Sequence, residues 1–307
     1  MGGGEKMQIF ITGGTGFIGR HLCQSLHTQN HSLTVLSRQA DSRVRAICGE
    51  VAVVHSLDDL TPDHRFDAIV NLAGAPIIGP RWTERRKQVL WDSRVTLTER
   101  LVDWIDRAEA KPGVLVSGSA VGYYGDQGDR ILDEETPPVA EGFGHRLCAA
   151  WEQAATKAED HGVRVCRLRT APVIGKNGGI LSRMLFPFKL GLGGRIGDGR
   201  QWMSWSHLDD HVRMTERLLE DGGLSGPFNA AAPESVTNAE FTATLARLLH
   251  RPAFMPIPAM GLKLVMGEMA EILLASQRAI PKRFQEAGFQ FRYSTLEEAL
   301  EDVLAAD

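Results

Sequence analysis

Cysteine is scarce in this sequence, and no two cysteines stand at a spacing typical of metal ligands. Only four occur among the 307 residues, and none forms a Cys-x-x-Cys pair. Isolated cysteines of this kind are most simply buried thiols in a reducing cytoplasm. We therefore expect a cytoplasmic protein without a metal site. The four are Cys23, Cys48, Cys148 and Cys166.

An excess of charge of one sign and a long apolar run are also missing. Lys and Arg total 34 and Asp and Glu total 38, which gives a formal net charge of −4. A nucleic-acid binder normally carries a basic stripe, so no nucleic-acid partner is expected. The apolar stretch 262–275 is interrupted by Glu268 and Glu271 and is too short to span a bilayer, so no membrane partner is expected either. Residues 1–6, MGGGEK, are interpreted as a vector-derived remnant or a disordered start without a targeting signal.

Short apolar runs alternate with helical stretches over the first 170 residues. The run at 7–12, MQIFIT, ends in a glycine cluster, which is typical of a buried parallel strand. Strands that alternate with helices predict an α/β fold with a Rossmann-type doubly wound parallel sheet. Further strands are expected at 33–37, 51–54, 68–72, 114–118 and 163–169, and long helices at 84–108 and 143–160.

The alternation ends after Arg169, where glycine-rich turns such as GLGGRIGDGR at 191–200 follow. Helical patterns dominate from Thr237 onward. We expect a smaller, mainly helical C-terminal substrate lobe over the carboxyl ends of the strands, where ligands bind in such sheets. The predicted boundaries are 7–172 for the Rossmann domain, with 205–232 returning to it, and 173–204 with 233–307 for the lobe.

The stretch ITGGTGFIG at 11–19 follows the first predicted strand and opens a helix. Glycine permits a tight turn and lets backbone N–H groups approach a pyrophosphate at the helix N-terminus, where the helix dipole favours anions. The spacing is G-x-x-G-x-x-G, and a glycine turn without a ligand is the alternative. In this strand–turn–helix context the pattern predicts a dinucleotide site. The expected contacts are Gly13, Thr15, Gly16, Phe17, Ile18 and Gly19.

The end of the second strand indicates which dinucleotide is bound. An NAD site usually offers Asp or Glu there, which accepts a hydrogen bond from the ribose 2′-hydroxyl. This strand ends in Ser37 and Arg38 instead. A guanidinium and a hydroxyl suit a 2′-phosphate, and an exposed surface arginine is the alternative. The predicted cofactor is therefore NADP(H).

Together these residues resemble the extended or atypical short-chain dehydrogenase/reductases, relatives of the nucleotide-sugar epimerases and dehydratases. The resemblance covers almost everything from Met7 onward, including TGGTGFIG at 12–19, NLAGAP at 71–76 and GDGRQWMSWSHLDD at 197–210. It points to an epimerase-like branch of the NAD-dependent epimerase/dehydratase type. The resemblance implies further cofactor contacts at Leu72, Ala73, Gly74, Arg94, Ser117 and Arg169. For the two arginines, a structural salt bridge is the alternative to a cofactor contact.

Active members of this family carry a Tyr-x-x-x-Lys pair that this chain lacks. The resemblance implies that the tyrosine exchanges a proton with the substrate while the lysine holds the nicotinamide ribose. Aligning the family's downstream glutamate with Glu152 puts Gly144 in the tyrosine position and Cys148 in the lysine position. Residues 134–156 contain neither tyrosine nor lysine. Because losing a positioned acid or base typically removes about 10²–10⁴ in rate, standard epimerase chemistry is doubtful.

Nearby side chains offer substitutes for the missing pair. Ser119 matches the family's substrate-hydroxyl serine to within one residue, and Tyr123, Tyr124 and His145 lie close in sequence. Cys148 would be a nucleophile if its pKa were lowered, and a small buried hydrophobe is the alternative. In the predicted lobe, the candidate substrate contacts are Arg200, Trp202 and His207. For these residues, packing and helix anchoring are the alternatives to substrate binding.

Three functional hypotheses follow from these patterns. The first is an NADP(H)-binding oxidoreductase of the extended short-chain type that acts on an unknown small substrate without the usual pair. The second is an NADPH-binding sensor or interaction protein with little or no turnover. The third is a nucleotide-sugar epimerase. The family resemblance also allows a homodimer through the helices at 84–108 and 143–160.

Overall fold

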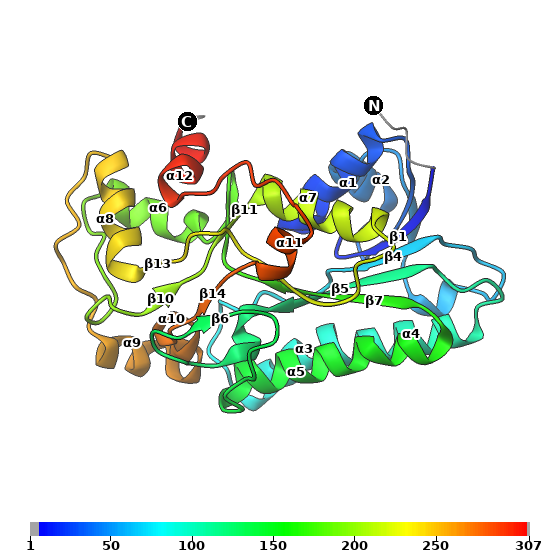
Figure 1. Ribbon diagram of the computed structural model, residues 1–307, viewed down its shortest axis with the longest axis horizontal. Helices are drawn as coiled ribbons and strands as arrows, with labels where there is room; N and C mark the ends of the chain where they lie inside the picture. Colours follow the sequence, from blue (N-terminus) through cyan, green and yellow to red (C-terminus); the bar gives the residue numbers. More distant parts are fainter. Residues whose placement is uncertain (1–5, 306–307) are drawn as a thin grey trace.

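The centre of the molecule is a seven-stranded parallel sheet (Figure 1). In the computed structural model, which describes residues 6–305, the strand order is β12-β7-β5-β4-β1-β2-β3. The order runs outward from β1 in both directions, so the predicted doubly wound arrangement is confirmed. The strands are β1 (Gln8–Thr12), β2 (Ser32–Leu36), β3 (Ala52–Val54), β4 (Ala68–Asn71), β5 (Val114–Ala120), β7 (Arg164–Thr170) and β12 (Gly226–Ala230).

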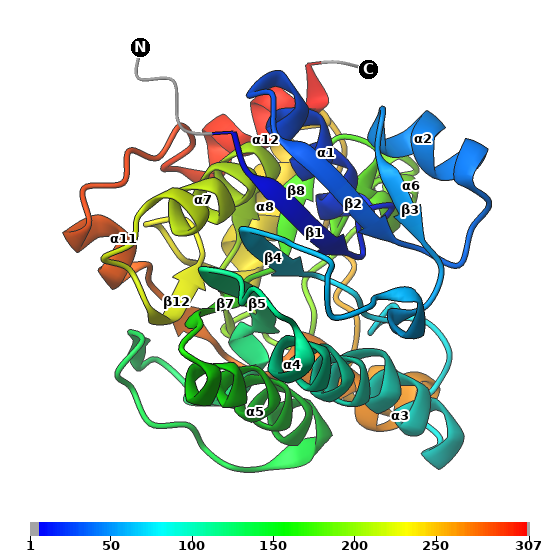
Figure 2. The ribbon, with the colours of Figure 1, turned by 90° about the vertical axis from the view of Figure 1, so that its right-hand side faces the viewer.

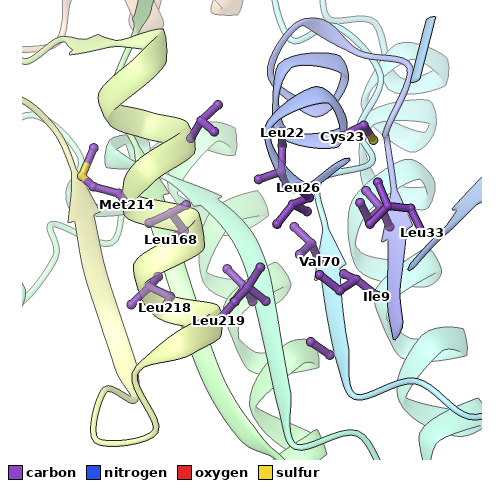
Figure 3. Packing of buried hydrophobic residues seen from close by; sticks show 14 of the residues in the cluster. Ile9, Leu22, Cys23, Leu26, Leu33, Val70, Leu168, Met214, Leu218 and Leu219 are labelled. Carbon is purple, nitrogen blue, oxygen red and sulfur yellow. The ribbon is translucent and has the colours of Figure 1, made fainter. Parts of the chain in front are cut away.

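Strand β1 shows why the sheet strands lack a polar alternation. Successive side chains of a strand point to opposite faces of the sheet. Ile9 and Ile11 pack into the hydrophobic cluster on one face (Figure 3), whereas Phe10 packs into the cluster on the other. All three are fully buried. A continuous apolar run is therefore the signature of a parallel strand that is covered on both sides.

Helices cover both faces of the sheet (Figure 2). On one face, Leu22, Leu26 and Met214 pack toward the strands (Figure 3). On the other face, Leu101 and Trp104 do the same. The first face carries α1 (Phe17–Thr28), α2 (Asp41–Cys48) and α7 (Leu208–Glu220), and the second carries α3 (Glu84–Trp91), α4 (Leu97–Arg107) and α5 (Gly142–Thr156).

The single helix expected at 84–108 is interrupted in the structure. Helices α3 and α4 are joined by a π-helical turn, η2 (Asp92–Thr96). Such turns are rare and occur often at functional sites, because they push one side chain out of the regular helical register. This turn carries Arg94. The helix expected at 143–160 is α5 followed by a 3₁₀ turn, η4 (Lys157–His161).

The chain after β7 forms a second packed region with its own core. Trp205, Phe241 and Leu300 are fully buried there. Strand β12 returns from this region to pair with β7, with Gly226 opposite Cys166. The lobe boundaries given above stay a prediction. The remaining elements are β6 (Ile131–Leu132), β8 (Val173–Gly175), β9 (Gly178–Gly179), β10 (Trp202–Met203), β11 (Ser206–His207), β13 (Val236–Thr237), β14 (Arg278–Ala279), α6 (Leu181–Lys189), α8 (Asn238–Leu248), α9 (Ala259–Met266), α10 (Glu271–Leu274), α11 (Lys282–Glu286) and α12 (Leu296–Leu304), with 3₁₀ turns η1 (Leu57–Asp59), η3 (Val121–Tyr124) and η5 (Gly267–Ala270).

The helices of the described chain are too short or too polar to cross a lipid bilayer. Between residues 6 and 305, no helix combines the length and the hydropathy of a membrane span. Residues 1–6 are interpreted above as a remnant or a disordered start. Of these, residues 1–5 lie outside the described residues.

Candidate functional site

The turn after β1 requires glycine at two positions and is less crowded at a third. Gly13 adopts a φ of +74°, and a Cβ there would lie 2.7 Å from the Leu72 carbonyl group. A Cβ on Gly19 would lie 2.2 Å from the Gly13 carbonyl oxygen, so this glycine lets α1 approach the turn. For Gly16, the Gly13 oxygen at 3.1 Å would be the one neighbour within 4 Å. Apart from that one close contact, no protein atom outside the adjoining residues fills this position, which suits a backbone cradle for a pyrophosphate.

The N-terminus of α1 has no side chain that caps it. Gly16 is the N-cap residue, it has no side chain to accept a hydrogen bond, and the first helical turn contains no acidic residue. The first N–H groups of a helix have no partner within the helix, and the helix dipole makes this end positive. The residues at this end therefore fit an anionic ligand. Thr15, Phe17 and Ile18 lie around it.

The end of β2 presents a cation without a partner. Arg38 is exposed, and its side chain makes no hydrogen bond or ion pair with any residue in the described range 6–305. The neighbouring Ser37 is buried, and its hydroxyl accepts a hydrogen bond from the Gln39 N–H group at 3.2 Å. Gln39 Nε2 in turn donates to Thr15 Oγ1 at 3.4 Å, which links this strand end to the glycine turn. The predicted 2′-phosphate residues therefore lie next to the predicted pyrophosphate cradle.

Buried polar side chains tie the ends of β1, β4 and β5 together. Thr12 Oγ1 donates to Asn71 Oδ1 at 2.7 Å and accepts from the Ala73 N–H group at 3.1 Å. Asn71 Nδ2 donates to Thr98 Oγ1 at 2.7 Å and to Ser117 Oγ at 3.3 Å. Ser117 is thus fully buried within this network. The segment that the network fixes contains the predicted contacts Leu72, Ala73 and Gly74.

Arg94 projects from η2 against the segment that follows β4. A Cβ on Gly74 would lie 2.8 Å from Arg94 Cζ, so the guanidinium packs directly on this glycine. Its Nη2 donates to the Ala75 carbonyl oxygen at 2.9 Å, and its Cζ lies 5.4 Å from the centre of the Trp151 ring. The side chain is partly exposed and forms no ion pair with the described residues. Burial lowers the pKa of the Arg94 guanidinium, and the positive charge of Arg86 lowers it further.

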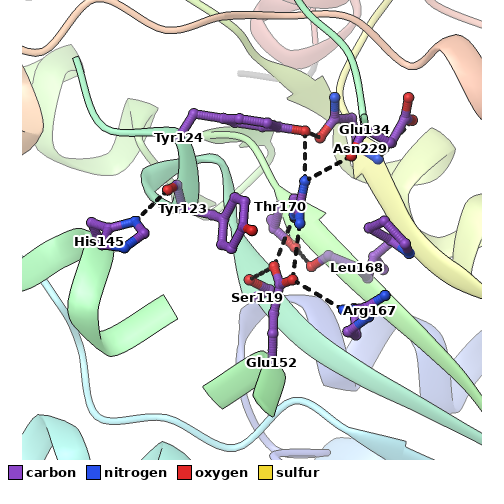
Figure 4. A network of polar contacts seen from close by, with 12 residues as sticks. Ser119, Tyr123, Tyr124, Glu134, His145, Glu152, Arg167, Leu168, Thr170 and Asn229 are labelled. Atoms are coloured by element: carbon purple, nitrogen blue, oxygen red, sulfur yellow. Dashed lines mark hydrogen bonds and ion pairs between the residues drawn. The ribbon is translucent and has the colours of Figure 1, made fainter. Parts of the chain in front are cut away.

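The carboxylate of Glu152 lies beside Ser119 (Figure 4) and also binds Arg169. Ser119 Oγ donates to Glu152 Oε1 at 2.7 Å. Arg169 donates from Nε to Oε1 at 2.8 Å and from Nη2 to Oε2 at 3.0 Å. All three residues are buried. Both predicted site residues are therefore bonded to the protein itself.

The two neighbouring tyrosines have different surroundings. Tyr124 is fully buried, its hydroxyl donates to Asn229 Oδ1 at 2.8 Å, and burial raises its pKa to about 12. Tyr123 is partly exposed, and its ring covers the guanidinium of Arg169 at 3.6 Å. Across residues 6–305 no hydrogen bond engages the Tyr123 hydroxyl. His145 lies beside it, with Nδ1 2.6 Å from the Tyr123 carbonyl oxygen (Figure 4).

Gly144 and Cys148 lie one turn apart on α5. A Cβ built on Gly144 would meet no atom within 4 Å outside its own helix, so the space directly beside this glycine is open. Cys148 Sγ would lie 3.7 Å from a Cβ on Gly122, next to the end of β5. Burial raises the pKa of the Cys148 thiol to about 12. The thiol therefore stays protonated at neutral pH, which makes it a poor nucleophile.

The predicted substrate contacts in the C-terminal region take part in separate interactions. Trp202 Nε1 donates to Asp129 Oδ1 at 2.9 Å. His207 caps α7, because its Nδ1 accepts from the Asp209 N–H group at 3.2 Å. Arg200 is exposed. No group of three His, Cys, Asp or Glu side chains in the described part of the chain is arranged to hold a metal ion.

Comparison with known proteins gives two family matches. Residues 9–231, more than half of the chain, match the NAD dependent epimerase/dehydratase family. The chain belongs to that family. Residues 257–303 match a domain of unknown function, DUF1731. The resemblance drawn from the glycine turn and the later motifs is thereby confirmed.

Relatives of this epimerase-family chain are similar to it over nearly its whole length. The Epimerase family protein YfhF of Bacillus subtilis is 37% identical over 303 residues, which are 97% of this chain and 98% of the relative. The Epimerase family protein Mb2239 of Mycobacterium bovis is 40% identical over 298 residues, 95% and 96% of the two chains. The crystal structure of the human epimerase family protein SDR39U1 (isoform 2) with NADPH has 33% identity and a TM-score of 0.88. It covers 97% of this chain and 99% of the human one. This match confirms the Rossmann-type fold.

Two polar residues of this epimerase-family site were not recognised from the sequence as members of a network. Asn71 joins the ends of three strands. Glu152 was matched to the family's downstream glutamate but was not predicted to bind another site residue. A signal exists for Glu152, because Arg169 falls within a strand of the central sheet, directly after the buried Leu168, and a buried arginine needs a counter-charge. No local pattern shows that the counter-charge comes from α5, 17 residues earlier in the chain.

Proposed function

We propose that this epimerase-family protein is an NADP(H)-binding oxidoreductase of the extended short-chain type, acting on a small substrate without the Tyr-x-x-x-Lys pair. The observation that carries the proposal is the exposed, unpaired Arg38 beside Ser37, at the strand end where an NAD site offers an acid. Arginine is well suited to a phosphate because its planar fork of donors matches phosphate oxygens. NADPH in the human relative supports the same cofactor here.

The cofactor would extend across the carboxyl ends of the central strands. The start of α1 would bind the pyrophosphate through backbone N–H groups, and Ser37 with Arg38 would bind the 2′-phosphate. The segment 72–74 would line the adenosine side. Ser117 and Arg169 would act indirectly, by fixing the strand ends, since both are bonded to protein groups. Bound NADPH would supply a hydride, and the chain would orient it.

Tyr123 is the side chain best suited to handle the proton that accompanies hydride transfer. It lies in η3, the 3₁₀ turn after β5, it is partly exposed, and within residues 6–305 its hydroxyl is unengaged. Ser119 and Tyr124, by contrast, are buried with their hydroxyls bonded. A general acid must reach the substrate oxygen within about 3 Å or through one water. His145 lies against Tyr123 and is the second candidate. The acceptor would be a carbonyl or an alkene.

A binding protein with little turnover is the second candidate function. The open space at Gly144 and the protonated thiol of Cys148 favour it, because neither position supplies an acid, a base or a fixed cation. In that case NADPH would serve as a structural or redox-sensing ligand. Nucleotide-sugar epimerase chemistry is the third candidate, supported by the family but weakened by the same two positions.

Titration of the purified protein with NADPH and with NADH tests the cofactor assignment. We expect NADPH to bind at least about tenfold more tightly, a difference of about 1.4 kcal/mol. Equal affinities would contradict the role of Arg38. A screen of carbonyl and quinone compounds for NADPH oxidation then separates the candidates. Tight NADPH binding without oxidation of NADPH by any compound would favour the sensor.

A further inference from the structure

Large apolar side chains gather on the outer surface of the C-terminal region. Of the twelve that residues 6–305 leave exposed, nine lie in two segments, 186–192 and 254–265. Helix α9 shows the pattern best, because none of its residues is buried. Met260 and Leu264, four positions apart on one face of this helix, are 84% and 79% exposed. The exposed apolar side chains of the two segments are called the outer patch below.

The two segments of the outer patch lie side by side. The Ile257 N–H group donates to the Arg195 carbonyl oxygen at 2.8 Å, and the Gly197 N–H group donates to the Ile257 carbonyl oxygen at 2.8 Å. A Cβ on Gly191 would lie 3.4 Å from Pro252 Cγ. In Figure 1 the connection from α8 to α9 runs along the edge of the molecule opposite α1 and α2. The patch is therefore one continuous surface at the end of the molecule away from these helices.

The charged residues of this surface all have the same sign. The stretches 180–197 and 249–267 contain five Lys and Arg residues and no Asp or Glu, although acids outnumber bases in the whole chain. Three of the five are exposed, and their side chains make no hydrogen bond or ion pair with any residue between 6 and 305. These three cations are Arg195, Arg251 and Lys263.

The acids that flank the two stretches are engaged elsewhere. Asp198 Oδ1 accepts a hydrogen bond from the Arg200 N–H group at 3.0 Å, and Glu268 Oε2 lies 2.7 Å from Lys87 Nζ. Beside the unpaired cations, a cleft of about 480 Å³ is lined by Arg195, by Phe254 and by small alanine side chains. The surface therefore offers positive charge, exposed apolar side chains and room for a group that enters from outside.

We propose that the outer patch docks on a bilayer surface that carries anionic phospholipids. Large exposed apolar patches mark interaction sites, and apolar side chains interleaved with lysine and arginine suit the boundary between headgroups and acyl chains. There the apolar side chains enter the lipid while the cations meet phosphate groups. A second copy of the chain fits less well, because joining two such surfaces would bring cations against cations.

Surface docking differs from the membrane partner that the sequence argued against. That expectation concerned a segment able to span the bilayer, and a helix that lies in the interface needs no span. The inference is also independent of the proposed cofactor and reaction, because the outer patch contains none of the residues assigned to them.

Vesicles of phosphatidylcholine alone, and of phosphatidylcholine with an equal part of phosphatidylglycerol, are matched probes that differ in headgroup charge. Co-sedimentation of the full-length protein measures its partition onto each. We expect partition onto the charged vesicles to be stronger by at least about tenfold at low salt. Salt at about 1 M should remove this preference, because it shortens the Debye length to about 3 Å.

Two variants separate the apolar contribution from the electrostatic one. Leu264→Ser should weaken partition onto the charged vesicles by about tenfold, because a side chain that enters the lipid is lost. Lys263→Gln should weaken it by about fivefold. Val89→Ser and Arg43→Gln are the matched controls, since they remove an exposed apolar side chain from α3 and an exposed charge from α2. Both controls should bind the vesicles like the original protein.

Several outcomes would overturn the docking surface. Absence of partition onto the charged vesicles, or equal partition onto both kinds, does so without any variant. If light scattering then shows a dimer that Leu264→Ser abolishes, the outer patch joins two copies of the chain instead. Losses in Leu264→Ser and Lys263→Gln no larger than those in their controls would place the contact elsewhere on the molecule. Vesicle binding by a protein that fails to bind NADPH would support the docking surface and refute the proposed function.

Discussion

Arg169 and Glu152 form a two-pronged ion pair in the interior of the protein. Nε and Nη2 of the arginine lie 2.8 and 3.0 Å from the two carboxylate oxygens, and the side chains are 3% and 4% exposed. Arg169 lies near the end of β7 and Glu152 lies on α5, so the pair joins this helix to the sheet beside the site. Ser119 shares the same carboxylate. Arg169 was predicted from the sequence as a cofactor contact, but its positive charge is balanced by the carboxylate of Glu152.

Glu152→Leu should destabilise the protein by about 3–5 kcal/mol, because it leaves the Arg169 charge buried without a partner. The double variant Glu152→Leu/Arg169→Met should lose less, since neither charge then remains. Urea unfolding followed by circular dichroism measures both. The exposed pair Arg247–Glu297 is the control, and its removal should have no measurable effect. A single variant as stable as the original protein would show that the buried pair is not structural.

Arg38→Asp should weaken NADPH binding by about 2–4 kcal/mol, because it removes a charge-assisted bond and adds a like charge. NADH binding should change less. Arg43→Asp is a matched control, since Arg43 is also exposed and the net charge changes equally. Calorimetric titration of both variants with NADPH and with NADH measures these changes in affinity. Equal losses of NADPH affinity would mean that general electrostatics, and not a phosphate contact, is responsible.

The parts of the molecule that local chemistry determines were predictable from the sequence. Apolar runs such as 7–12 marked strands, and the glycine turn marked the start of α1, because both depend on neighbouring residues. The network of Glu152 with Arg169 was not predictable from the sequence, because its members come from different helices and strands. The π-helical turn was missed because the helical pattern continues through 92–96. How Arg94 packs on Gly74 therefore could not be foreseen either.

Gly16→Val should abolish NADPH binding while the fold is kept. Gly16 has a φ of −75°, which valine adopts, and the added side chain would fill the space left for the pyrophosphate. Gly13→Val is the instructive comparison, because a φ of +74° and a contact at 2.7 Å should destabilise the protein itself. Thermal unfolding and NADPH titration separate the two effects. Near-original NADPH affinity in Gly16→Val would exclude this turn as the cradle.

Acid should destabilise the protein through His211. This side chain is fully buried, its Nε2 lies 3.0 Å from Thr170 Oγ1, and burial lowers its pKa to about 4. The unfolded chain takes up the proton near pH 6.5, so stability falls as the pH drops from about 6.5 to 4, by up to about 3 kcal/mol. His211→Gln should make this fall shallower in urea unfolding at several pH values. The exposed His250→Gln should leave it unchanged, and an unchanged slope in His211→Gln would contradict the assignment.

Proton transfer at the active site should depend on Tyr123 and not on Cys148. Once the screen has found a compound that NADPH reduces, Tyr123→Phe should lower kcat by about 10²–10⁴ with little change in KM, because the ring stays while the proton donor is lost. Cys148→Ala should keep its turnover, since a buried thiol with a pKa near 12 carries no negative charge at neutral pH. Ser119→Ala should act mainly on stability, through Glu152. Turnover lost in Cys148→Ala but kept in Tyr123→Phe would reverse these roles and make the cysteine catalytic.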